Sequence, residues 1–403
     1  MILYVPLMGS DKDKPFPKDL KSLKAFAGRG DVVAQFQIGA IYADGEGVKK
    51  DYIEALKWFR KAADKGLSES ENGLGMLYRD GLGVEQDYQE ALKWFRKAAG
   101  SGFLSAQNSL GEMYAEGKGL PLNQRDPKEA LKYFRMAADG GHAHAQSNIG
   151  VMYSKGLGVT KDDKEALKWF RMAADSGFPK AQNSLGEMYA KGKGLPLMQP
   201  NPKEALKWFY KAADSGFSEA QSNIGVMYLK GHGVSKDNKE ALKWFHKAAK
   251  QGHVKSQATI GSMYVKGVGA ERDYKEALKW VRKAANAGNS RAQYQLGGMY
   301  FLGLGVPIDN KEILKWYRKA ADGGHAAAQN NLGVMHFNGE GGVKHDLVDA
   351  YVWVTIGALN GDRHAIQTKK IYTNFLDPEQ LDQAAMIVGE MVKKNPKLIQ
   401  KKD

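Results

Sequence analysis

The sequence repeats itself at a nearly constant interval along most of its length. A glycine in the phrase AQxxLGxMY, or a close variant of it, recurs every 36 residues, and the step lengthens to 39 after the third and fifth copies. The nine glycines are Gly39, Gly75, Gly111, Gly150, Gly186, Gly225, Gly261, Gly297 and Gly333. A period of this length is typical of stacked supersecondary units, each of which covers the apolar face of its neighbour. We therefore expect an elongated array of repeats.

Each copy predicts two helices, called helix A and helix B, joined by a glycine-rich turn. Helix A of the first copy has an apolar stripe at the helical spacing, formed by Ala34, Ile38, Ile41 and Tyr42. The glycines of ADGEGV end this helix because glycine adopts the backbone angles of a tight reversal. Helix B has an apolar face formed by Ala55, Phe59, Ala62 and Ala63. The sequence therefore predicts an all-α fold in which small residues let the two helices approach closely.

The third and fifth copies are longer by the same three residues, in GKGLPLNQRDPKEA and GKGLPLMQPNPKEA. Residues 106–180 and 181–255 also match each other better than adjacent copies do, which indicates that a block of two repeats was duplicated as a unit. This pattern concerns the origin of the array and implies nothing about its function.

The tryptophans occupy one place in the repeat. All eight lie at the same position of helix B, and Tyr133 takes that place in the third copy. They are Trp58, Trp94, Trp169, Trp208, Trp244, Trp280, Trp316 and Trp353. A ligand-stacking platform needs aromatic residues at a few chosen positions, whereas one in every copy favours packing between repeats.

The repeated motifs resemble the Sel-1-like repeat family, relatives of the tetratricopeptide repeats. AQNSLGEMYAEGKG followed by KEALKYFRMAADGGHAHAQ carries the family's AxxxLGxxY, GxG and AxxWxxxAA signatures, and the resemblance covers residues 31–361 in nine copies. It implies a right-handed α-solenoid superhelix, with A helices on the concave surface and B helices on the convex one. It also implies an adaptor or scaffold, frequently bacterial. A cysteine-rich branch is associated with beta-lactam binding or hydrolysis, and this chain has no cysteine.

The two ends are predicted to cap the array. In residues 1–30, the stretch 18–31 is similar to a degenerate helix B, with Leu20, Leu23 and Ala27 on its apolar face. In residues 362–403, Asp377 and Pro378 predict the start of a closing helix, and NPKLIQKKD predicts a mobile basic tail. The first eight residues are apolar but too short for a signal peptide or a membrane span, so we expect a cytoplasmic protein, or an exported one if the true start lies upstream.

No motif predicts a catalytic residue, a cofactor or a metal. The GxG turns follow a helix instead of a strand, and the glycines around Lys118 lack both the spacing and the following Ser or Thr of a P-loop. The nine histidines, among them His142, His144 and His336, show no metal-ligand spacing. The absence of cysteine excludes a disulfide scaffold, a zinc ribbon and a thiol nucleophile.

The chain is basic, with 59 Lys and Arg against 45 Asp and Glu and a net charge of +14. Much of the excess forms one row along the B helices: Lys57, Lys93, Lys132, Lys168, Lys207, Lys243, Lys279 and Lys315, with Arg60, Arg96, Arg135, Arg171, Arg282 and Arg318 beside it. One interpretation is a convex ridge that attracts nucleic acid or an anionic membrane. The other, which we favour, is a solvated face, because a glutamate lies three residues before each lysine.

A candidate partner-binding surface lies on the side of helix A opposite its apolar stripe. The positions expected to line the concave groove vary between copies: Asn72, Met76, Arg79, Asn108, Glu112, Ser147, Val151, Asn183, Glu187, Ser222, Val226, Leu229, Val265, Tyr294, Phe301, Asn330, Val334 and Phe337. Toward the C-terminus, Leu229, Val265, Phe301 and Phe337 would make a continuous apolar strip. The alternative is that these side chains pack on neighbouring A helices.

These observations lead to three hypotheses of function. The first is a non-enzymatic adaptor that holds a protein or peptide partner in the groove. The second is electrostatic binding of nucleic acid or an anionic membrane along the helix B row. The third is a hydrolase of beta-lactam or cell-wall-type substrates.

Overall fold

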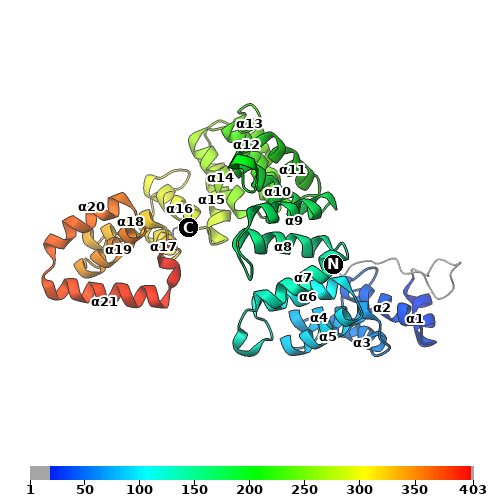
Figure 1. Cartoon of the computed structure of the whole chain (residues 1–403). Helices are drawn as coiled ribbons and strands as arrows, with labels where there is room; N and C mark the ends of the chain where they lie inside the picture. Colours follow the sequence, from blue (N-terminus) through cyan, green and yellow to red (C-terminus); the bar gives the residue numbers. More distant parts are fainter. Residues whose placement is uncertain (1–18, 401–403) are drawn as a thin grey trace. The chain divides into compact units, whose positions relative to one another are not determined.

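The computed structural model describes residues 19–400, and all of the regular structure in that range is helical (Figure 1). Every repeat is a helical hairpin, as the sequence predicts. The A helices are α2 (Val32–Asp44), α4 (Ser68–Asp80), α6 (Leu104–Glu116), α8 (Ala143–Lys155), α10 (Pro179–Lys191), α12 (Ser218–Lys230), α14 (Val254–Lys266), α16 (Ser290–Leu302) and α18 (Ala326–Asn338). The B helices are α3 (Tyr52–Ala63), α5 (Tyr88–Gly100), α7 (Pro127–Asp139), α9 (Asp163–Asp175), α11 (Pro202–Asp214), α13 (Asn238–Lys250), α15 (Tyr274–Asn286), α17 (Asn310–Asp322) and α19 (Leu347–Leu359).

Shorter elements extend the longer turns and close the ends. The 3-10 turns η1 (Pro121–Asn123) and η2 (Pro196–Met198) lie in the two insertions. Helix α1 (Leu20–Gly28) precedes the first repeat. After the last repeat come α20 (Arg363–Tyr372), η3 (Thr373–Phe375), α21 (Pro378–Lys394) and η4 (Pro396–Leu398).

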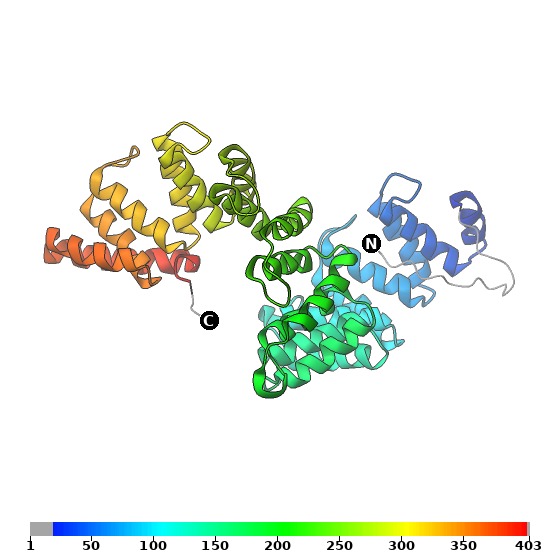
Figure 2. The ribbon, with the colours of Figure 1, turned by 90° about the horizontal axis from the view of Figure 1, so that it is seen from above.

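The chain divides into two compact units, Met1–Ala205 and Leu206–Asp403, called unit 1 and unit 2. The division falls inside α11. Within each unit, helices that follow one another in the chain pack side by side (Figures 1 and 2).

Local chemistry sets the helix ends. Most B helices begin after an aspartate whose carboxylate accepts backbone hydrogen bonds from the first turn, as Asp51 does from the N–H groups of Ile53 and Glu54. The A helices end at a glycine in the left-handed conformation, such as Gly81 with φ 66°. These two signals recur in the sequence and explain why the hairpins repeat so regularly.

The helices of a hairpin meet at a glycine and an aromatic ring. A Cβ atom built on Gly75 in α4 would lie 2.6 Å from the ring of Phe95 in α5, which is closer than real Cβ contacts. Phe95 itself is fully buried. The predicted role of the small residues of helix A is therefore confirmed, because only glycine leaves room for the ring.

The tryptophans pack between repeats, as predicted. Trp94 of α5 joins the apolar cluster of the preceding repeat, which contains Phe36 and Phe59, and Trp280 of α15 joins a cluster with Phe245. Trp94, Trp208, Trp280, Trp316 and Trp353 are buried, and Trp58, Trp169 and Trp244 are half-buried.

A buried glutamine also joins adjacent repeats. In seven of the A helices its side-chain N–H group donates to the carbonyl oxygen of an alanine eight residues earlier, at the end of the preceding helix, over 3.0–3.4 Å. These residues are Gln35, Gln107, Gln146, Gln182, Gln257, Gln293 and Gln329. Each of these alanine carbonyls also accepts from the backbone N–H group of the glycine three residues later, so the glutamine supplies a second donor to a carbonyl at the end of a helix.

Apolar residues at both ends are covered by additional helices. In α1, Leu23 and Ala27 are buried against Ala34 and Ile38. Asp377 caps α21 in a capping box with Gln380. The expectation of a mobile tail after α21 is wrong for residues 395–400, because Leu398 is 2 % exposed in a cluster with Trp353 and its carbonyl accepts from Gln329 at 3.0 Å. Residues 1–18 and 401–403, where the rest of the predicted terminal segments falls, lie outside the described residues.

Candidate interaction surfaces

The predicted groove residues form a graded surface on the A helices. The predicted groove residue nearest the start of each A helix from α4 to α10 is buried. These residues are Asn72, Asn108, Ser147 and Asn183. Asn108 donates to Glu112 on its own helix at 3.1 Å and accepts from Asn148 of the next A helix at 3.1 Å. Burial of these four side chains favours the alternative of packing over an open groove at this position, and Asn108 is also engaged by the neighbouring A helix.

The later positions in unit 1 remain partly open, and Arg79, Glu112 and Glu187 among them are polar. Arg79 is half-buried and forms a two-pronged pair with Asp80 at 2.7 and 2.8 Å, which raises the pKa of its guanidinium. Glu112 lies 3.8 Å from His144, and burial lowers the pKa of that imidazole. Glu187 accepts from Asn183 at 3.1 Å. Met76 and Val151 are half-buried, and Met76 packs on the adjacent apolar cluster.

In unit 2 most of the predicted apolar strip belongs to the packing. Leu229, Val226 and Val265 are half-buried and pack against the cores of neighbouring helices. Tyr294 stacks on His325, with ring centroids 4.4 Å apart. Ser222, Asn330 and Val334 are also half-buried.

Phe337 is not an open groove residue. Its ring stacks on Tyr372 of α20 at 4.3 Å and meets Phe375 edge-on at 5.4 Å. The prediction of a continuous apolar strip is therefore wrong at its C-terminal end, because α20 and η3 cover that side chain. Phe301 is different, since 57 % of it is exposed.

Phe301 belongs to an exposed apolar group that we call the repeat 8 patch, formed with Leu302 and Ile308. Leu302 is 63 % exposed and Ile308 66 %. A Cβ built on Gly303 would lie 3.5 Å from Ile308, which places that side chain beside the end of α16. Sequence reasoning missed Leu302 and Ile308. The sequence did contain a signal. At the position of Leu302 the other copies carry Asp, Glu, Lys or Asn, and at the position of Ile308 they carry Lys, Gln, Arg, Pro or His.

The lysines of the helix B row are largely paired with glutamates. Lys57 lies 2.6 Å from Glu54, and this hydrogen bond raises the pKa of the lysine. The same spacing of three residues gives Lys93–Glu90, Lys132–Glu129, Lys168–Glu165, Lys243–Glu240, Lys279–Glu276 and Lys315–Glu312. This geometry supports the solvated-face interpretation of the row.

The arginines beside that row are also engaged. Arg96 donates to the hydroxyl of Tyr114 at 2.9 Å, and Arg282 to that of Tyr300 at 3.0 Å. Arg60, Arg135 and Arg171 make the equivalent bonds to Tyr78, Tyr153 and Tyr189. Each bond joins a helix B to the following helix A, so these arginines hold repeats together.

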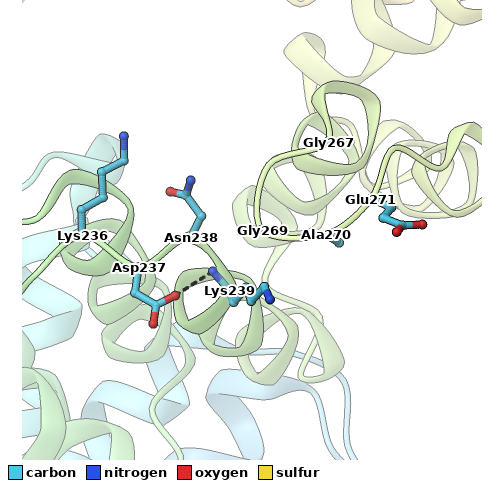
Figure 3. Close-up of a pocket in the computed structure, with 8 residues that line it drawn as sticks. All are labelled: Lys236, Asp237, Asn238, Lys239, Gly267, Gly269, Ala270 and Glu271. Carbon is cyan, nitrogen blue, oxygen red and sulfur yellow. Dashed lines mark hydrogen bonds between the residues drawn. The ribbon is translucent and has the colours of Figure 1, made fainter.

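One surface hollow of about 610 Å³ lies in unit 2 between the start of α13 and the turn after α14 (Figure 3). Asp237 accepts from the N–H group of Lys239 at 2.9 Å and caps α13, whereas the side-chain oxygen of Asn238 is buried without a hydrogen-bond partner. A Cβ on Gly269 would lie 2.3 Å from the carbonyl oxygen of Asn238, so the second glycine of the GxG turn permits close packing on the preceding repeat. The described residues contain no group of three potential metal ligands.

None of the helices in residues 19–400 combines the length and the apolar character needed to cross a bilayer.

Comparison with known proteins identifies the repeat. The Sel1 repeat family matches nine consecutive segments: residues 32–67, 68–103, 104–142, 143–178, 179–217, 218–253, 254–289, 290–325 and 326–362. A search of curated proteins found no significant match.

Solved structures with the same repeat are similar over most of the chain. A Sel1 repeat protein from Oxalobacter formigenes is 34 % identical over 78 % of this chain and 90 % of its own, with a TM-score of 0.59. A protective antigen of uropathogenic Escherichia coli strains that displays an SLR fold is 32 % identical over 97 % of this chain and 92 % of its own, with a TM-score of 0.48. The tetratricopeptide-containing signal transduction ATPase of Pyrococcus horikoshii is similar in fold alone, at 15 % identity over 85 % of this chain and 55 % of its own, with a TM-score of 0.50.

The predicted all-α repeat fold and the predicted resemblance are thus both confirmed. The chain belongs to the Sel1 repeat family, whose members are in general non-catalytic scaffolds for protein interactions.

Proposed function

We propose that this protein is a non-enzymatic adaptor that binds a protein or peptide partner on the exposed side of its A helices, with the repeat 8 patch as the apolar anchor. The observation that carries this proposal is the exposure of Phe301, Leu302 and Ile308 at 57, 63 and 66 %. Contiguous exposed apolar side chains mark interaction surfaces, and a few well-buried anchors supply most of the affinity of an interface.

The cost of this exposure supports a role in binding. Transfer of each side chain from water to an apolar interface is worth about 1.5–3 kcal/mol. At the positions of Leu302 and Ile308 the other copies carry charged or polar residues, or a proline, so the fold does not require leucine and isoleucine there. The position of Phe301 is apolar in several copies, as at Leu229 and Val265, but those side chains pack against neighbouring helices. A partner with an apolar side chain of its own would cover the patch. The polar residues Glu112, Glu187 and Arg79 in unit 1 would supply hydrogen bonds to a partner on that unit.

The test replaces the patch with the surface of another copy. The variant Phe301→Ser, Leu302→Lys, Ile308→Lys carries the residues that the fourth repeat has at Ser154, Lys155 and Lys161, so it is compatible with the fold. Affinity capture from a lysate of the source organism should retain a protein on the wild type, with retention reduced about tenfold or more for the variant. Circular dichroism should show the same helicity for both.

A matched control is Met386→Ser, which removes another exposed apolar side chain, 70 % exposed on α21. Capture should survive this change. If the patch variant retains the same protein as the wild type, the patch is not the anchor. Substitution of Leu229 or Phe337 would not serve, because both side chains contribute to the packing.

The electrostatic alternative has a separate test. Binding of nucleic acid along the helix B row would weaken steeply with salt. The pairing of its lysines with glutamates argues against it. A fluorescence titration with duplex DNA at two salt concentrations distinguishes the two proposals.

A further inference from the structure

We infer that the two insertion loops of unit 1, residues 117–126 and 192–201, are a pair of apolar tips that bind the surface of an anionic lipid bilayer. Leu122 and Leu197 are 89 and 88 % exposed, and Met198 is 76 % exposed. These are the most exposed large apolar side chains in the described part of the chain. They serve no packing function in the repeat, since the copies without the insertion lack them.

The backbone holds both tips in the same costly conformation. Leu122 and Leu197 have φ 54°, and the residues that follow them, Asn123 and Met198, have φ 52°. The left-handed region costs a residue with a branched side chain roughly 1–2 kcal/mol. Both loops have the exposed leucine in this conformation, although the next residue is Asn123 in one and Met198 in the other. Strain of this kind concentrates at functional sites.

Backbone hydrogen bonds and close packing hold both loops in the conformation that exposes the leucines. The N–H group of Met198 donates to the carbonyl of Leu195 at 3.1 Å, and that of Asn201 to Tyr189 at 2.8 Å. A Cβ on Gly192 would lie 2.2 Å from the carbonyl oxygen of Met198, so the loop rests directly on the end of α10. The first loop has the same bonds, from Asn123 to Leu120 at 3.0 Å and from Asp126 to Tyr114 at 2.9 Å.

Basic residues flank each tip in the sequence. The basic residues are Lys118, Arg125 and Lys128 around the first tip, and Lys191, Lys193 and Lys203 around the second. Residues 191–203 contain no acidic residue, and residues 117–128 contain only Asp126, which caps α7 by accepting from Glu129 at 3.0 Å. Just before the loops, Glu116 pairs with Lys118 at 2.6 Å and Glu187 with Lys191 at 3.5 Å, so the charge offered to a bilayer comes from Arg125, Lys128, Lys193 and Lys203. A basic residue near an anionic bilayer contributes about 1 kcal/mol to binding. Apolar side chains flanked by Lys and Arg are the combination that binds the interface of such a bilayer.

The arrangement suits a bilayer better than a protein. A specific protein interface needs roughly 1,000 Å² of complementary surface, which isolated side chains on two separate loops do not offer. A fluid bilayer accepts separate tips without a complementary shape. Both loops join the A helix to the B helix of their own repeat and therefore lie on the same edge of unit 1, two repeats apart. Two tips on one body bind together more tightly than either alone.

The absence of cysteine from the chain allows a direct test. Leu122→Cys in the full-length protein is labelled with a polarity-sensitive fluorophore and mixed with phosphatidylcholine vesicles, with and without phosphatidylserine. The matched control is Leu157→Cys, which lies in the turn of a repeat without the insertion and is 44 % exposed. We expect a blue shift at position 122 with phosphatidylserine vesicles only, and none at position 157. No shift at 122, or an equal shift at both positions, overturns the inference.

Vesicle co-sedimentation of unlabelled protein distinguishes binding through the apolar tips from binding through the net positive charge of the chain. The variant Leu122→Ser, Leu197→Ser, Met198→Ser should bind phosphatidylserine vesicles about tenfold more weakly than the wild type. Phe301→Ser, in the repeat 8 patch, should bind them like the wild type, which keeps this result independent of the proposed adaptor function. Equal sedimentation of the triple variant and the wild type overturns the inference. So does the absence of wild-type binding, which would leave a protein as the ligand of the tips.

Discussion

The ammonium group of Lys97 lies 3.0 Å from the carboxylate of Glu71 and donates to the carbonyl oxygen of Ala63 at 3.2 Å. Glu71 stands where seven other repeats carry the glutamine that bonds to an alanine carbonyl. A carboxylate has no N–H group to donate, and the side chain of Glu71 is only 2 % exposed. Lys97 therefore pairs with one oxygen of the buried carboxylate and gives the Ala63 carbonyl the second donor that a glutamine supplies in other repeats.

Removal of the lysine should destabilise the protein. In Lys97→Met, which introduces the residue found at Met136 and Met172 in later copies, Glu71 loses its ion-pair partner while buried. We expect the free energy of unfolding to fall by about 2 kcal/mol. This is less than the cost of breaking a fully buried ion pair, because half of the lysine side chain is exposed and solvent screens the interaction. Urea denaturation followed by circular dichroism measures the change.

The double variant Lys97→Met, Glu71→Gln is the control for that experiment. It restores the glutamine bond of the other repeats and should recover most of the lost stability. If Lys97→Met alone leaves the unfolding midpoint unchanged, the ion pair does not stabilise the fold.

Two adjacent glycines of α16 should respond to alanine with opposite signs. A Cβ on Gly297 would lie 2.6 Å from the ring of Tyr317, whereas the nearest atom to a Cβ on Gly298 is the Tyr317 hydroxyl at 3.9 Å. Gly297→Ala should cost about 1–3 kcal/mol through overpacking. Gly298→Ala should gain about 0.5–1 kcal/mol, because alanine loses less backbone entropy in a helix. Thermal denaturation of the two variants measures both effects. A shift of the melting temperature in the same direction for both variants would contradict the close approach of Gly297 to Tyr317.

The C-terminal segment should contribute to stability through one leucine. Leu398 is 2 % exposed among Trp353 and Ile356, so Leu398→Ala should lower the free energy of unfolding by about 2–3 kcal/mol. Leu359→Ala, at a side chain 60 % exposed on α19, should change it far less. Equal effects of the two substitutions on urea denaturation would show that residues 395–400 do not dock.

His336 should make stability depend on pH. Burial lowers the pKa of His336, and Arg318 lowers it further while Asp349 at 3.7 Å opposes the shift. The unfolded chain therefore binds the proton more readily than the folded chain. The stability contributed by the neutral imidazole is complete above the ordinary histidine pKa of about 6.5 and is lost as the pH falls through the folded value.

His336→Tyr tests this dependence because it restores the residue that the other copies have as the partner of the helix B arginine. The denaturation midpoint of the variant should fall less than that of the wild type between pH 7 and pH 5. His364→Gln, at a side chain 84 % exposed, should leave the profile unchanged. A profile for His336→Tyr that matches the wild type would exclude His336 as a source of the pH dependence.

The helical hairpins could be predicted from the sequence because their signals are local. The period of the apolar residues, the aspartate or asparagine before each B helix and the glycine after each A helix act within one or two turns of chain. Trp94 and its equivalents could be placed between repeats because their recurrence in every copy leaves packing as the simplest explanation.

Features that depend on a partner far along the chain could not be predicted. The pairs of Arg96 with Tyr114 and of Lys97 with Glu71 join residues 18 and 26 positions apart on different helices. From the sequence, Phe337 is predicted to lie on the surface, and only the structure shows that Tyr372 of α20 stacks on it. The left-handed backbone of Leu122 has no signal in residue type, because leucine disfavours it.

The pairing of Glu71 with Lys97 restricts how the array can be rearranged. Both residues lie in residues 68–103, so the second repeat carries its own replacement for the missing glutamine. Recombination between near-identical copies at a repeat boundary moves the carboxylate and the lysine together and preserves a stable interface. A crossover inside the hairpin that joins α4 to α7 or α9 instead combines Glu71 with Met136 or Met172 and leaves a buried charge. In this array, a B helix can therefore follow α4 without leaving a buried charge only where it carries the lysine, as α11, α13, α15 and α17 do at Lys211, Lys247, Lys283 and Lys319.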